Sequence, residues 1–167
     1  MLVKNGRIAD DRFTPVADAD ALPAEGEVIV SLKRFLAEHD ALLQRGTPVG
    51  VRLESSESPE ALGERVHELA LVVLAIPYFK DGRIFSWARL LRTRLGYKGE
   101  IRVSGHFLRD QIAFLARVGV DAFDITQTLS LDDFTAALHE ISNIYQPAVD
   151  ARPTIRDLRA HRQPPAA

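Results

Sequence analysis

The side chains best suited to chemistry gather between Pro77 and Phe123, where arginines, aspartates and aromatic residues are unusually dense. Arginine and histidine side chains can bind an anion, and an aspartate can pair with either of them. From these residues we select candidates for a ligand-binding or anion-binding site: Asp81, Arg83, Arg92, His106, Arg109 and Asp110. The sequence assigns no catalytic residue, so an enzyme and a binding protein are both compatible with it.

The turn Asp81-Gly82-Arg83 is the best single candidate. Gly82 allows a tight turn into a following helix, and Asp81 can cap that helix. A positive charge in the first helical turn is unfavourable for the helix dipole, so Arg83 is available to an anion. The alternative is a capped helix with a solvated arginine.

Arg92 lies at the margin of the apolar face of the same expected helix, one turn after Ala88. A guanidinium there needs a carboxylate or a ligand, and Glu54 and Asp110 are candidate partners. His106 follows a Ser-Gly pair and can donate a proton or contact an anion.

Five strand–helix units in succession must position these residues. Strands are expected at residues 28–30, 48–53, 69–76, 100–103 and 120–125, and helices start after Ser31, at Pro59, and at residues 82, 108 and 130. Residues 2–8 predict a hairpin with an Asn-Gly turn, and residues 9–26 an irregular segment. The last helix is expected to span residues 130–144.

Alternating strands and helices predict an α/β fold with a mostly parallel sheet covered by helices. A doubly wound sheet is the first interpretation, and an incomplete βα barrel is the alternative. Ligands bind outside the carboxyl ends of parallel strands. The loops expected there are residues 54–57, 78–83, 104–109 and 126–128.

The chain is expected to divide into one α/β domain, residues 1–146, and a mobile tail rich in proline and arginine, residues 147–167. The alternative for the tail is a basic arm that docks on a partner, with Ile155 and Leu158 as apolar contacts.

Composition excludes several classes of function. The formal net charge of −2 argues against nucleic acid as a partner. The chain has no cysteine, which rules out thiol catalysis and thiolate metal sites, and its histidines lack metal-ligand spacing. It contains no dinucleotide fingerprint, P-loop or nucleophile elbow, so no cofactor is predicted.

The sequence also predicts where the protein is found. Without a signal peptide or an apolar run of membrane-spanning length, we expect a cytoplasmic protein that does not bind membranes.

Charge is unevenly distributed along the chain. Residues 80–102 contain seven lysines and arginines against two acids, whereas residues 54–68 contain five glutamates against one arginine. Such a distribution can steer charged ligands or protein partners.

The block between Pro77 and Phe123 resembles a bacterial family of uncharacterised proteins encoded beside sulfite reductase and other sulfate-assimilation genes. The resembling residues are Pro77, Phe79, Asp81-Gly82-Arg83, Ser86, Ala88-Arg89, Leu91-Arg92, Gly96-Tyr97, Gly99-Glu100, Arg102, Gly105, Asp110-Gln111 and the stretch 119–123. Members are sometimes labelled oxidoreductases.

The resemblance implies a pathway, the assimilatory reduction of sulfite to sulfide. The first hypothesis is an accessory protein that binds sulfite reductase or its electron donor, which the uneven charge, the basic tail and the absence of a cofactor motif favour. The alternative is an enzyme of the same pathway that binds a small oxyanion or a nucleotide, or an oxidoreductase that holds a flavin noncovalently. A homo-oligomer is compatible with either alternative.

Overall fold

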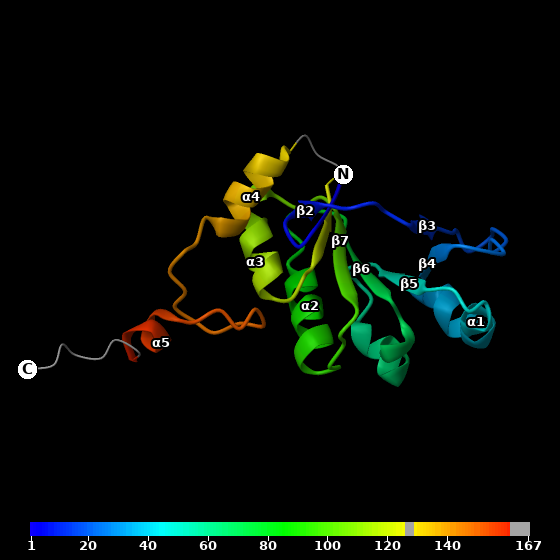
Figure 1. Cartoon of the computed structure of the whole chain (residues 1–167). Coiled ribbons are helices and arrows are strands. Elements are labelled where there is room, and N and C mark those ends of the chain that lie inside the picture. Colours follow the sequence, from blue (N-terminus) through cyan, green and yellow to red (C-terminus); the bar gives the residue numbers. More distant parts are fainter. Residues whose placement is uncertain (126–128, 161–167) are drawn as a thin grey trace, which may run out of the picture.

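Strands and helices alternate along the chain in the computed structural model, which describes residues 1–125 and 129–160 (Figure 1). The elements are β1 (Leu2–Lys4), β2 (Arg7–Ile8), β3 (Phe13–Pro15), β4 (Glu27–Ser31), α1 (Leu32–Gln44), β5 (Val49–Leu53), η1 (Pro59–Glu68), β6 (Leu71–Ile76), α2 (Arg83–Thr93), β7 (Glu100–Gly105), η2 (Arg109–Gln111), α3 (Ile112–Arg117), β8 (Ala122–Asp124), α4 (Leu131–His139) and α5 (Ile155–Ala160). The elements η1 and η2 are 3₁₀ helices.

The strands form one sheet in the order β2-β1-β8-β7-β6-β5-β4-β3, curled like half of a barrel (Figure 1). Strands β3 to β8 run parallel to one another, and β1 runs antiparallel to both β2 and β8. The predicted α/β fold, its mostly parallel sheet and its N-terminal hairpin are confirmed. The doubly wound interpretation is wrong, because β3 to β8 follow one another in sequence without the reversal of strand order that defines a doubly wound sheet. The incomplete barrel is the arrangement observed.

The N-terminus is fixed at one margin of the sheet. Asn5 and Gly6 both have positive φ, 51° and 74°, as the hairpin turn requires. The Met1 ammonium group donates a hydrogen bond to the Ile125 carbonyl at 3.0 Å. The chain then crosses to the opposite margin, where Phe13–Pro15 pairs with β4. Residues 9–26 were expected to be irregular, and this short strand differs because it forms by pairing with β4, which the local sequence does not indicate.

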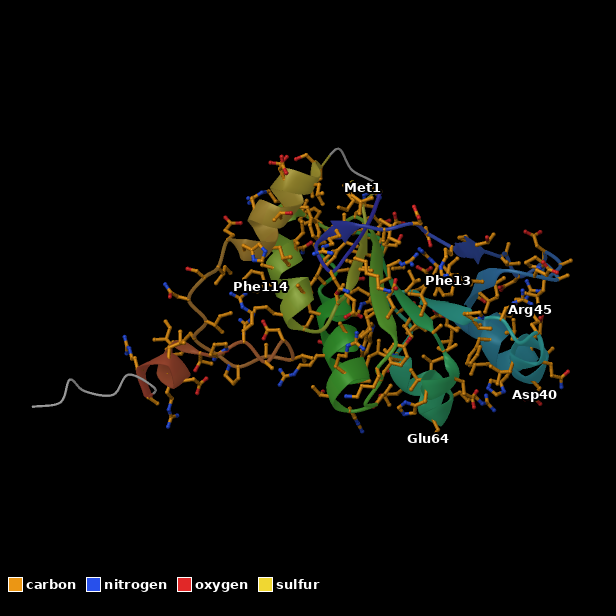
Figure 2. All side chains as sticks on the ribbon, in the orientation of Figure 1. Met1, Phe13, Asp40, Arg45, Glu64 and Phe114 are labelled. Carbon is orange, nitrogen blue, oxygen red and sulfur yellow. The ribbon has the colours of Figure 1, made fainter. Side chains whose placement is uncertain are left out.

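The helices pack on one face of the sheet and build the main core. Apolar side chains from β4 to β8 meet apolar side chains from α1, η1, α2, α3 and α4 in a single cluster. A second, smaller cluster on the other face contains Ile29, Leu71 and Val73, with Phe13 packed against it (Figure 2). Strand β6 is buried on both faces along its whole length, which explains its continuous apolar sequence.

Helix α4 ends earlier than the sequence predicts, at His139 instead of Ile144. The Ile144 carbonyl accepts a hydrogen bond from the Ile155 amide at 2.7 Å, and the Ile144 side chain is buried. This contact with the start of α5 directs the chain away from the helical path.

Among residues 1–125 and 129–160, none of the helices combines the length and the apolar composition that crossing a membrane requires.

Gly105, at the end of β7, has a φ of +111°, and a Cβ atom there would lie 2.3 Å from the Ile76 carbonyl oxygen. We expect Gly105→Ala to lower the free energy of unfolding by about 2–4 kcal/mol, since alanine disfavours this φ and would displace β6. Urea denaturation measures the change. The control is Gly82→Ala, which has no atom within 4 Å of its new Cβ and a φ of −78°. We expect it to change stability by less than about 1 kcal/mol, and equal effects would contradict this description of β7.

Candidate functional site

The carboxyl ends of β5, β6 and β7 bring three loops together at one edge of the sheet, where ligands of open parallel sheets bind. Ser55 follows β5, Asp81 and Arg83 follow β6, and His106 follows β7. The His106 amide donates to the Ile76 carbonyl at 2.8 Å, so the second and third loops are joined directly.

Asp81, Arg83 and Ser55 form a hydrogen-bonded cluster at this edge. Arg83 contacts both carboxylate oxygens of Asp81, through Nε at 2.9 Å and Nη2 at 2.6 Å, and Nη2 also donates to Ser55 Oγ at 3.1 Å. The Trp87 indole donates to the Ser55 carbonyl at 3.1 Å. Together these bonds fasten the start of α2 to the loop after β5.

This pairing changes the protonation of both charged groups. The Arg83 guanidinium, with a smaller contribution from the Ser55 hydroxyl, holds the pKa of the Asp81 carboxyl well below its usual range. In return, the Asp81 carboxylate raises the pKa of Arg83. The pair therefore stays ionised, and the Arg83 side chain is still 54% exposed.

Arg92 lies at the opposite edge of the sheet. Its guanidinium donates to the carbonyls of Gly119 (3.0 Å), Tyr97 (2.9 Å) and Gly99 (2.8 Å), and forms an ion pair with Asp121. These four residues precede β7 and β8, so they mark the amino ends of the strands.

The partner of Arg92 is thus neither Glu54 nor Asp110, the two carboxylates that the sequence suggested, but Asp121. The reason is that α2 begins at the carboxyl ends of the strands and its last turn reaches their amino ends. Asp121 also accepts the Ile101 amide at 2.9 Å, which ties β7 into the same cluster.

Two of the residues that bond to Arg92 have further structural roles at the amino ends of the strands, which we call the amino edge. Gly119 has a φ of +104°, and a Cβ atom there would lie 2.5 Å from Arg92 Cγ. The buried Tyr97 hydroxyl donates to the Leu69 carbonyl at 3.2 Å, and burial raises the pKa of this phenol. Many of the polar side chains between Pro77 and Phe123 therefore stabilise the amino edge.

The remaining candidates lie after β7 and are exposed. The Arg109 guanidinium pairs with the Glu140 carboxylate at 2.9 Å, and both side chains are about half exposed. Asp110 stands in the first turn of η2 and, within the described residues, its side chain has no hydrogen-bond partner. The structure thus brings five of the six candidates to the carboxyl edge and places Arg92 at the other end.

Residues 126–128, which were expected to contribute to this edge, lie outside the described residues, as do His161, Arg162, Pro164 and Pro165 of the tail. Within residues 1–125 and 129–160, no three His, Asp or Glu side chains come together in a way that could hold a metal ion.

Large apolar side chains at the carboxyl edge were not selected from the sequence. Tyr78 is 68% exposed, Phe79 53% and Leu108 40%. Gln111 joins their two loops, because its Nε2 donates to the Phe79 carbonyl at 2.8 Å and its Oε1 accepts the Leu108 amide at 3.0 Å. The available signal was an aromatic pair placed between a fully buried strand and a glycine turn. We call the exposed residues Tyr78, Phe79, Lys80, His106 and Leu108 the carboxyl-edge surface.

The sequence profile of a family described as bacterial protein of unknown function (DUF934) matches residues 50–155, more than half of the 167-residue chain. The chain belongs to this family. The region shared with DUF934 begins in β5 and ends at the first residue of α5, so it includes both the Arg92 cluster and the carboxyl-edge surface. No curated protein matches the chain.

The ion pair at the carboxyl edge makes stability depend on pH. Because the pKa of Asp81 is lower in the folded chain, the carboxylate stabilises the fold above the ordinary aspartate pKa of about 3.9. That contribution is lost as the pH falls through the lowered pKa. We expect the stability difference between the wild type and Asp81→Asn to be constant at neutral pH and to shrink in acid, measured by urea denaturation.

The control is the same substitution in an Arg83→Met background. Removing the guanidinium removes the main cause of the pKa shift, so most of the pH dependence should disappear. An unchanged acid dependence in this background would contradict the assignment.

Proposed function

We propose that this protein is an accessory protein of assimilatory sulfite reduction that binds sulfite reductase or its electron donor through the carboxyl-edge surface. The pathway is suggested by the resemblance of residues 77–123 to proteins encoded beside sulfite reductase genes. The mode of action is suggested by the chemistry of the carboxyl edge, where exposed aromatic side chains adjoin basic ones.

Tyr78, Phe79 and Leu108 are exposed on two adjoining loops, and this exposure is the main support for the proposal. Burying apolar surface contributes about 25 cal/mol per Å². Aromatic side chains also dominate the central contacts of protein interfaces. A partner that covers these three side chains would gain that energy.

Hydrogen bonds within the chain connect the loops that carry the carboxyl-edge surface. Gln111 bonds to both loops, and the His106 amide bonds to the end of β6. A surface that needs little ordering loses less conformational entropy on association. The geometry therefore suits docking of a folded protein.

Charge next to the aromatic pair favours an acidic partner. Lys80 is exposed, and the half-exposed Arg83 keeps an Nη1 group that bonds to no other described residue. Basic groups at the rim of an interface accelerate association with an acidic surface more than they strengthen it.

The oxyanion-binding alternative receives less support. Arg83 is occupied by Asp81, Arg109 by Glu140, and Arg92 by backbone carbonyls at the other edge. An anion would have to compete with these internal partners. The oxidoreductase alternative rests on the resemblance alone.

The proposal is tested by co-purification of the tagged protein with assimilatory sulfite reductase and, separately, with its electron donor, both at low salt. We expect a complex with one of them. Substituting Tyr78→Ser together with Phe79→Ser should weaken it at least about tenfold, since two central aromatic contacts are removed.

The matched control is Ile8→Ser, which removes a side chain that is 62% exposed on the margin strand β2. It should leave the complex unchanged. Failure to detect either complex, or an equal loss with the control, would refute the proposal.

A further inference from the structure

Residues 145–160 form an arm that leaves the helical layer, extends away from the sheet and ends in α5 (Figure 1). Arg117, the last residue of α3, anchors the arm to the domain. Its Nη2 donates to the Gln146 carbonyl at 2.6 Å, its Nε contacts the Asp150 carboxylate at 3.3 Å, and its carbonyl accepts the Val149 amide at 3.1 Å. This anchor lies near the amino edge and is separate from the carboxyl-edge surface.

The outer part of the arm has its own local structure. Thr154 caps α5: its hydroxyl accepts the Asp157 amide at 3.2 Å, while the Asp157 carboxylate accepts the Thr154 amide at 2.8 Å. This reciprocal pair satisfies free backbone donors at the start of the helix. The bond from the Ile155 amide to Ile144 closes the arm into a loop.

An open pocket of about 560 Å³ lies between this loop and α5. Tyr145, Pro147 and Ile155 supply apolar lining, and Arg156 and Arg159 supply positive charge. Volumes of about 300–1,000 Å³ are typical of cavities that hold a ligand. Apolar surface remains uncovered beside it, since Tyr145 is 84% exposed and Leu158 54%.

Basic side chains outnumber acidic ones in the lining of this pocket, where Arg156 and Arg159 stand against Asp157. The Asp157 carboxylate accepts hydrogen bonds from the Thr154 amide and hydroxyl. Arg156 and Arg159 have no ion-pair partner among the described residues. Glu64, in the glutamate-rich η1, lies on the other side of the molecule from α5 (Figure 2).

We infer that the arm is a second binding site, which takes a short acidic peptide segment of a partner protein carrying one apolar side chain. The apolar side chain enters the cavity between Tyr145 and Ile155. Carboxylates on either side of it pair with Arg156 and Arg159, whose planar guanidinium groups match carboxylate geometry.

The experiment uses the full chain and a fluorescein-labelled peptide with blocked termini and the sequence Asp-Glu-Leu-Asp-Glu. We expect saturable binding by fluorescence anisotropy, weakening as salt is raised, because charge pairs at an exposed site are screened. A peptide with lysine in place of each acid should not bind.

Replacing both Arg156 and Arg159 by alanine should weaken peptide binding at least about tenfold. The matched control replaces two exposed arginines elsewhere, Arg7 and Arg65, and should leave the affinity unchanged. Absence of saturable binding, or an equal loss in the control, would overturn the inference.

Two outcomes separate this site from other possibilities. If the wild type sediments as a dimer that the Arg156→Ala/Arg159→Ala variant dissociates, the occupant of the arm is a second copy and the acidic-peptide inference is overturned. If the Tyr78→Ser/Phe79→Ser variant binds the peptide as the wild type does, the arm acts independently of the carboxyl-edge surface, as we infer.

Discussion

The arrangement of the sheet depends on the Arg92 guanidinium, which joins the segments leading into β7 and β8 to the last turn of α2. It is mostly buried, and its charge is matched by Asp121 and by three carbonyls. Removing one partner of such a group leaves an uncompensated buried charge, at a cost of about 3–5 kcal/mol. Arg92 and its partners hold the residues that lead into β7 and β8. They therefore also help to position the loops that follow the carboxyl ends of these two strands.

The two edges of the sheet consequently differ in character. At the amino edge, charged side chains bond to backbone groups and to one another, as Arg92 and Asp121 do. At the carboxyl edge, the ion pairs Asp81–Arg83 and Arg109–Glu140 join side chains to each other, and aromatic side chains lie exposed beside them. In βα barrels, the amino end serves stability and the carboxyl end serves function. We propose the same division for this half-barrel.

Local signals in the sequence predicted the elements well. The apolar run of β6, the Asn5-Gly6 turn, and the helix caps Ser31 and Ser130 all appear in the structure. Strand order was not accessible, because the same strand–helix repeat serves a doubly wound sheet and a barrel. The partner of Arg92 was not accessible either, since helical periodicity places its side chain on a face but does not say which loop meets that face.

We propose that a protein partner covers the carboxyl edge. Hydrogen–deuterium exchange, measured with and without sulfite reductase and its electron donor, tests it directly. We expect slower exchange in residues 77–81 and 106–111 when the partner is present, with no change in residues 97–99 and 119–121 at the amino edge. Protection confined to the amino edge would show that the partner binds elsewhere.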